Sequence, residues 1–141
     1  EEPLQRYLSG HTGTMWLCSD YGTALREIRA GQKTTHWIWY ILPQLQGLTG
    51  DTVTEYYGLR GRREAQAFLD HPLLGARLRE MAEALLTLGQ EDPVVIFGKT
   101  DAYKLRACMT LFDALSPEDV FDAVLERYCL GGRDADTLAL L

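Results

Sequence analysis

The segment PLLGARLREMAEALLTL, residues 72–88, decides the fold class of this chain. Its large apolar side chains recur at steps of four and three residues, which is the spacing of one α-helical face, at Leu74, Leu78, Met81, Leu85 and Leu88. Pro72 suits the first turn of such a helix, and Gly89 suits its end. The segment therefore predicts an amphipathic helix that packs its leucine-rich face into a core.

Helical periodicity continues along most of the chain, and no alternating strand pattern of convincing length interrupts it. Further helices are predicted over residues 3–9, 21–30, 61–69, 101–115 and from Ser116 to Tyr128, with a last turn over 137–141. Residues 91–97 predict a short turn, and 10–18 and 45–60 predict loops, with one helical turn over 54–57. Residues 1–141 are thus expected to form a single all-α domain, a compact bundle of about six or seven short helices.

Short polar side chains mark where several of these helices should begin. Caps are predicted from Ser19 or Asp20, from Thr34 or Thr35, from Thr100 or Asp101, from Ser116, and from Asp134 or Asp136. The start at Ser116 carries the strongest signal, because a proline and two acidic residues follow it in the first turn.

The charge balance limits the classes of partner. The chain has 14 Lys and Arg residues against 20 Asp and Glu residues, a net charge of −6 and a pI near 5.0. Duplex nucleic acid and anionic membranes both need a basic face, so neither is expected as a partner. A small anionic ligand needs only two or three local donors and remains compatible with this charge.

The cysteines favour a reducing compartment, and we expect a cytoplasmic protein. Cys18, Cys108 and Cys129 are odd in number, widely spaced and without a CxxC motif, and the last two lie in apolar helical patterns. No run approaches the roughly 18 apolar residues of a membrane-spanning helix. No signal peptide is recognised, and the start at Glu1 without methionine indicates a processed or trimmed terminus.

The stretch THWIWYILPQ, residues 35–44, is the most aromatic part of the chain. As a helix it would be apolar nearly all round and hence buried, whereas an extended form would place Trp37 and Trp39 on one face. We favour a short helix that ends before Pro43. The tryptophans serve either as core or as the wall of a site for a planar ligand, with Gln44 supplying a polar group at the end of the block.

His36 is the histidine best placed for chemistry. It opens the aromatic block, and its imidazole is the one plausible proton carrier at neutral pH in a catalytic version of the site, although a structural role is the simpler interpretation. Lys104 and Arg106 follow near the predicted start of a helix, where cations oppose the helix dipole. They should therefore have partners, which are either Asp101 and Glu118–Asp119 or a bound anion.

Other motifs are weaker. Gly98-Lys99-Thr100 resembles the end of a phosphate-binding P-loop, but Pro93 stands where that loop needs its first glycine. The three histidines and the cysteines lack metal-ligand spacing, so neither a metal nor another cofactor is predicted. No nucleophile and base can be paired from the sequence.

Five segments together resemble one protein family. They are GQKTTHWIWYILPQLQGL (31–48), EYYGL (55–59), HPLLGARLRE (71–80), IFG…D…KLRACMTLF (96–112) and GGRDADTLALL (131–141). Their order and spacing are similar to those of the bacterial and fungal family called domain of unknown function 1810, and the resemblance covers nearly the whole chain. Some members carry the label calpastatin, which nothing in this sequence supports.

The resemblance implies an all-α domain and no established reaction. Compared with the family pattern, the basic pair before the His-Trp is reduced to Lys33 ahead of Thr34-Thr35, and Ala107 and Cys108 stand in place of two serines. Met15 and Trp16 also replace residues that are usually polar. These departures argue against a site that depends on those serines.

Two functions fit these observations. In the preferred one, His36, Trp37, Trp39 and Gln44 form one wall of a site and Lys104 and Arg106 its cationic side, which suits a small planar anionic ligand such as a nucleotide-like compound, either bound or turned over. The alternative is a protein-interaction or structural module without catalytic activity, in which the aromatic block is core and partners bind helix faces such as 61–88.

Overall fold

The structure is a computed structural model that describes residues 2–13 and 18–141. These residues form ten helices and no strand, so the all-α expectation is confirmed. The helices are α1 Glu2–His11, α2 Tyr21–Arg29, α3 Ile38–Ile41, α4 Thr52–Tyr57, α5 Arg62–Asp70, α6 Leu74–Leu86, α7 Pro93–Phe97, α8 Lys99–Leu115, α9 Phe121–Cys129 and α10 Ala135–Leu140. Met15 and Trp16 lie outside the described residues.

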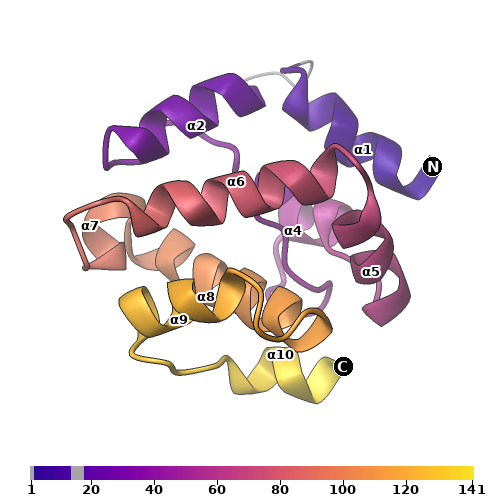
Figure 1. Cartoon of the computed structure of the whole chain (residues 1–141). Helices are drawn as coiled ribbons and strands as arrows, with labels where there is room; N and C mark the ends of the chain where they lie inside the picture. Colours follow the sequence, from indigo (N-terminus) through magenta and orange to yellow (C-terminus); the bar gives the residue numbers. More distant parts are fainter. Residues whose placement is uncertain (1, 14–17) are drawn as a thin grey trace.

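Helices α6 and α8 form the centre of the domain (Figure 1). Helix α6 contacts α2, α3, α5 and α9, while α8 contacts α5, α7, α9 and α10. Helices α1 and α2 cover one side of α6, and α9 and α10 lie on the opposite side of the molecule (Figure 1). None of the helices in the described part of the chain is long and apolar enough to cross a membrane.

The amphipathic pattern of 72–88 is confirmed in α6. Leu74, Leu78, Met81 and Leu85 are fully buried. The helix begins at Leu74 rather than at Pro72. Gly75 allows α5 to approach closely, because a Cβ atom there would lie 2.0 Å from the carbonyl oxygen of Leu69. A glycine at this position thus sets how tightly the α5–α6 pair packs.

The predicted starts of α8 and α9 are wrong. Helix α8 begins at Lys99 and is preceded by Gly98 at φ +84°, so Thr100 and Asp101 lie inside the helix instead of capping it. Helix α9 begins at Phe121, five residues after Ser116. The Ser116 hydroxyl donates instead to Asp119 (2.8 Å), which also accepts from Arg79. This side-chain network holds 116–120 as a turn, so local tertiary contacts override the helix-start signal.

Other helix starts agree with the sequence. Asp20 caps α2 by accepting from Thr23 N, and Asp134 caps α10 by accepting from Thr137 N. The turn predicted over 91–97 is a short helix, α7, capped by Asp92. The three cysteines are free, with Cys108 buried and Cys18 and Cys129 half-buried.

Candidate functional site

Glu27 on α2 organises the segment that leads into α3. Its Oε1 accepts from the backbone N–H groups of Thr34 (2.9 Å) and Thr35 (3.1 Å) and from the indole N–H of Trp37 (2.8 Å). Its Oε2 accepts from the Thr35 hydroxyl (2.5 Å). Burial opposes the ionisation of Glu27, but these hydrogen bonds outweigh it and lower its pKa to about 2.

This carboxylate explains why neither threonine caps α3. Thr35 uses its hydroxyl on Glu27, and Trp37 occupies the position before the helix without any side-chain cap. Trp37 is fully buried, with its ring 6.3 Å from the ring of Phe97. It therefore belongs to the core and does not line the cavity described below. The short helix predicted for this block is confirmed as α3.

His36 lies at the surface beside α3. Its side chain is exposed, and its ring centre is 6.2 Å from that of Trp39, with 35° between the ring planes. Its backbone carbonyl accepts from Ser19 N and from the Tyr40 hydroxyl, both at 3.0 Å. The backbone is thus fixed, and the imidazole lies exposed beside Trp39.

A small cavity lies where α3, α4 and α8 meet, and we call it the Lys104 pocket. It is lined by the apolar Ile38 and Leu42 and by five side chains that carry polar atoms, Trp39, Gln44, Thr54, Tyr57 and Lys104. Its volume is about 10 Å³, which is room for about one water molecule. Trp39, Gln44 and Lys104 were predicted as site residues, and the structure brings these three together.

The polar atoms of the Lys104 pocket lack protein partners. Among the described residues, five buried side-chain nitrogen or oxygen atoms make no hydrogen bond, and four of them belong to this pocket. They are the indole nitrogen of Trp39, both amide atoms of Gln44 and the hydroxyl of Tyr57. Each such group costs about 1–3 kcal/mol when buried unpaired. All four belong to side chains that line one cavity.

Lys104 adds a cation to this cluster. The residue is only 8% exposed, and its ammonium lies 5.3 Å from the centre of the Trp39 ring. It forms no hydrogen bond or ion pair within the described part of the chain. Two carboxylates considered as its structural partners are engaged elsewhere, since Asp101 pairs with Lys33 (2.8 Å) and Asp119 pairs with Arg79 (2.9 Å).

The pKa of Asp51 is affected by the charge of Lys104. Hydrogen bonds from Thr54 are the main cause of the lowered pKa of Asp51, and the charge of Lys104 contributes less. Asp51 binds Thr54 through its backbone N–H (2.8 Å) and its hydroxyl (2.9 Å), so this carboxylate is held by the start of α4. Lys104 lines the cavity without an ion-pair partner among the described residues.

Tyr57 is a donor at neutral pH. Burial is the main cause of its raised pKa of about 12, and Cys18 and Tyr56 add to the rise. The sequence analysis missed Tyr57 and Thr54 as lining residues. The EYYGL segment, which contributes to the family resemblance, was the sequence feature that could have pointed to them. It gave no chemical reason to select either residue.

A short parallel bridge places Gln44 next to Tyr57. Leu45 pairs with Leu59, through hydrogen bonds from Leu59 N to Gln44 O (2.9 Å) and from Gln46 N to Leu59 O (2.8 Å). Gly58 makes this approach possible, because a Cβ atom there would lie 2.6 Å from Gln46 Cα. The bridge joins residues on either side of α4, and no local sequence pattern predicts it.

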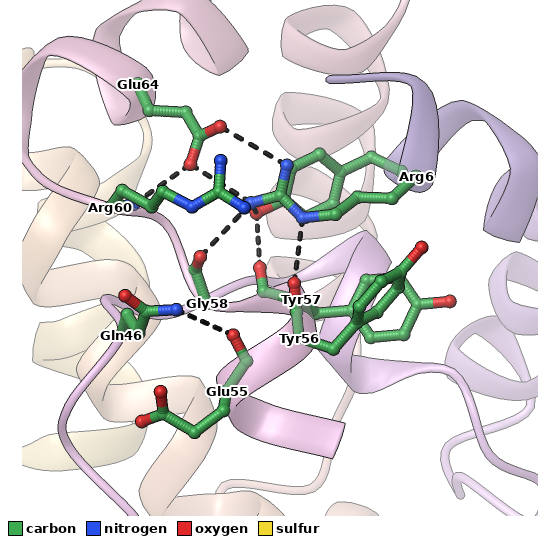
Figure 2. A network of polar contacts seen from close by, with 9 residues as sticks. Arg6, Gln46, Glu55, Tyr56, Tyr57, Gly58, Arg60 and Glu64 are labelled. Carbon is green, nitrogen blue, oxygen red and sulfur yellow. Dashed lines mark hydrogen bonds and ion pairs between the residues drawn. The ribbon is translucent and has the colours of Figure 1, made fainter. Parts of the chain in front are cut away.

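Arg6 fixes the end of α4 from the side of α1 (Figure 2). Its guanidinium donates to the carbonyls of Tyr56 (2.9 Å) and Gly58 (3.1 Å) and forms a two-point ion pair with Glu64 (3.0 and 3.2 Å). The Tyr7 hydroxyl donates to the carbonyl of Tyr57. These contacts anchor the backbone that carries Tyr57, whose hydroxyl makes no hydrogen bond.

Arg106 points elsewhere. Its side chain is exposed and donates to the carbonyls of Gly132 (3.2 Å) and Arg133 (3.1 Å), which ties α8 to the segment before α10. Residues two apart on a helix face different directions, so Lys104 and Arg106 do not share a surface. Ala107 and Cys108, which replace family serines, are fully buried in the core and do not line the Lys104 pocket.

The comparisons agree with the fold. The family described as "Protein of unknown function (DUF1810)" matches residues 1–141. This chain belongs to the DUF1810 family. A solved structure similar to it, the conserved hypothetical protein Rv1873 from Mycobacterium tuberculosis, is 37% identical, with a TM-score of 0.90. The match covers 98% of this DUF1810 chain and 95% of the other chain. No curated protein matches this DUF1810 chain significantly.

Proposed function

We propose that this domain binds a small planar anionic ligand, such as a nucleotide-like compound, at the Lys104 pocket. The observation that carries the proposal is the convergence of Lys104 with the unpartnered polar atoms of Trp39, Gln44 and Tyr57. Lys104 makes no ion pair among the described residues, so its ammonium is available to a bound anion.

The planar part of the ligand is assigned to the surface next to the cavity. The cavity itself holds about one water molecule and is too small for a ring. Trp39 is half-buried and His36 is exposed beside it, so a ring can stack on their faces while its acidic group approaches Lys104. In a catalytic version, His36 is the group that accepts or donates a proton there.

A thermal-shift screen of nucleotides and other planar anions tests this proposal. Binding compounds should raise the melting temperature of the wild type and have much less effect on Lys104→Met. Lys99→Met is the matched control, because it removes an exposed lysine from the first turn of the same helix. An unchanged response of Lys104→Met, or no response of the wild type to any compound at millimolar concentration, contradicts the proposal.

The alternative function, an interaction module, has one observation in its favour. Several large apolar side chains are exposed, above all Leu130, which is 94% exposed, with Val94 and Val95 about half exposed on α7. Size-exclusion chromatography with light scattering distinguishes the interaction module from the ligand-binding domain. If the domain self-associates through this surface, Leu130→Asp should have a lower molar mass in solution than the wild type. A monomer that responds to small anions supports the ligand site instead.

A further inference from the structure

We infer that the Lys104 pocket is an oxyanion subsite, which takes in one oxygen of the acidic head of the ligand and leaves its ring outside. This inference rests on the proposed function and adds which end of the ligand enters. Its starting point is the size of the cavity, about 10 Å³. One oxygen of a carboxylate or phosphate is comparable to a water molecule in size, so such an oxygen fits where a ring does not.

Several side chains around the cavity carry hydrogen-bond donors without a protein partner. Trp39 offers one N–H, Gln44 two, Tyr57 its hydroxyl and Lys104 its ammonium. Tyr57 keeps its proton at neutral pH because burial raises its pKa. Oxygens with negative charge accept several such bonds at once, and bonds to a charged acceptor are about twice as strong as neutral ones.

The carbonyl oxygen of Gln44 is the acceptor that the amide adds to this wall. This acceptor needs a hydrogen-bond donor on the ligand, next to the charged oxygen. A monoprotonated phosphate provides that donor through its own O–H group. A carboxylate provides it only when the ligand carries an N–H or O–H group beside the carboxylate. The shared chemistry is therefore an oxyanion with an adjacent donor. Phosphate and carboxylate are its two sources, and they are separated by experiment.

The charges around the cavity support an anion over a neutral amide. The carboxylate three residues before Lys104 on α8, Asp101, is neutralised by Lys33 at 2.8 Å. Asp51 is engaged by Thr54 and Thr49. Lys104 is thus the ammonium at the cavity without an ion-pair partner among the described residues, and a neutral head would leave it so.

The indole N–H of Trp39 gives a direct reading of occupancy. In ¹⁵N-labelled protein, its resonance is assigned from its loss in Trp39→Phe. Inorganic phosphate, acetate and acetamide are titrated separately, with sodium chloride holding the ionic strength constant. Acetate and acetamide have nearly the same shape and differ in charge, so the pair isolates the anionic requirement.

We expect phosphate or acetate to move the Trp39 resonance saturably, and acetamide to leave it in place. The tighter of the two anions identifies the head group of the ligand. The Trp37 indole, which is held by Glu27, should not move. Affinity should fall about tenfold or more in Lys104→Met and about threefold or more in Tyr57→Phe, and should be unchanged in Lys99→Met.

Equal shifts by acetate and acetamide, unchanged affinity in Lys104→Met, or no saturable shift at all overturn the inference. The proposed function fails separately. If a planar anion from the thermal screen binds as tightly as its neutral amide analogue, the ligand site stands and the oxyanion subsite is wrong. If phosphate or acetate saturates Trp39 while no planar compound binds, the subsite stands and the planar ligand is wrong.

Discussion

Lys33 reaches across from the α2–α3 segment to pair with Asp101 on α8 at 2.8 Å. Asp101 lies three residues before Lys104, which is a spacing at which helical side chains meet. The ion pair therefore occupies the carboxylate that would otherwise be the nearest helical partner of Lys104. The same Lys33 ammonium lies 5.2 Å from the centre of the Trp37 ring, so the pair also fixes the start of the aromatic block.

Lys33→Met should weaken anion binding without touching the pocket. Asp101, freed from Lys33, becomes available to Lys104, and we expect the affinity for an anionic ligand to fall about two- to fivefold. The free energy of unfolding should fall by about 1–3 kcal/mol, because one partner of a largely buried pair is removed. Calorimetric titration and urea denaturation measure the two effects. The double variant Lys33→Met/Asp101→Asn should regain the wild-type affinity, and failure to regain it contradicts this coupling.

Lys104→Met should stabilise the domain while it removes binding. Lys104 makes no ion pair that the substitution would break, and a methionine of similar length fills the same largely buried space beside Trp39 with an apolar side chain. We expect the free energy of unfolding to rise by about 1 kcal/mol, as measured by urea denaturation. Lys99→Met, at an exposed position, should stay within about 0.5 kcal/mol of the wild type. A destabilised Lys104→Met variant would mean that the ammonium has a structural role.

His11 should make stability fall in mild acid. Its Nε2 lies 2.8 Å from the Tyr40 carbonyl, which only accepts, and its Nδ1 lies 3.2 Å from the Arg77 guanidinium, which only donates. These contacts fix the neutral ring with its proton on Nε2. Burial is the main cause of the lowered pKa of His11, about 4 against an ordinary 6.5, and the charge of Arg77 adds to it.

Between pH 6.5 and 4 the unfolded state therefore binds a proton that the folded state does not. Stability is fully present above pH 6.5 and falls as the pH drops toward 4, by about 3 kcal/mol over the window. Urea denaturation at several pH values should show this slope in the wild type and a flatter profile in His11→Gln. Glu27 acts in a lower window, because its contribution is lost only as the pH falls from 4.5 toward 2. If stability falls with pH equally in the wild type and in His11→Gln, the assignment of this slope to His11 is wrong.

Gly58→Ala should disrupt the site through the backbone. The added methyl would lie 2.6 Å from Gln46 Cα and 2.8 Å from the Thr54 carbonyl oxygen, so the bridge between Leu45 and Leu59 has to open. We expect a loss of about 2 kcal/mol or more in stability and of ligand binding at the Lys104 pocket. Gly50→Ala is the control, since nothing lies within 4 Å of a Cβ atom there. Equal stability of the two variants would show that the bridge is dispensable.

The sequence predicted the parts of the fold that depend on local periodicity. The leucine face of α6 follows from residue spacing alone, whereas for the aromatic block a helix was only favoured over an extended form. The start of α9 was misplaced because Asp119 receives Arg79 from α6, 40 positions earlier in the chain. An arginine that is distant in sequence therefore determines whether the capping residues start a helix, and the spacing of residues in the sequence does not show this contact.

The candidate site was predicted in part for a similar reason. Trp39, Gln44 and Lys104 stood out by residue type, and the structure gathers them. Tyr57 joins them through the bridge at Leu59, and Trp37 turns away because Glu27 holds its indole. Residue type selects side chains that suit a ligand, whereas their direction depends on contacts that only the folded chain provides.

The parallel bridge between Leu45 and Leu59 closes a loop segment that contains α4 and the exposed glycines Gly47 and Gly50. Because this segment is held at both ends, additions or deletions near its tip should leave the distance between the Gln44 amide and the Tyr57 phenol unchanged. The segment therefore tolerates changes of length at its tip, because the bridge and not the loop sets where these two side chains lie.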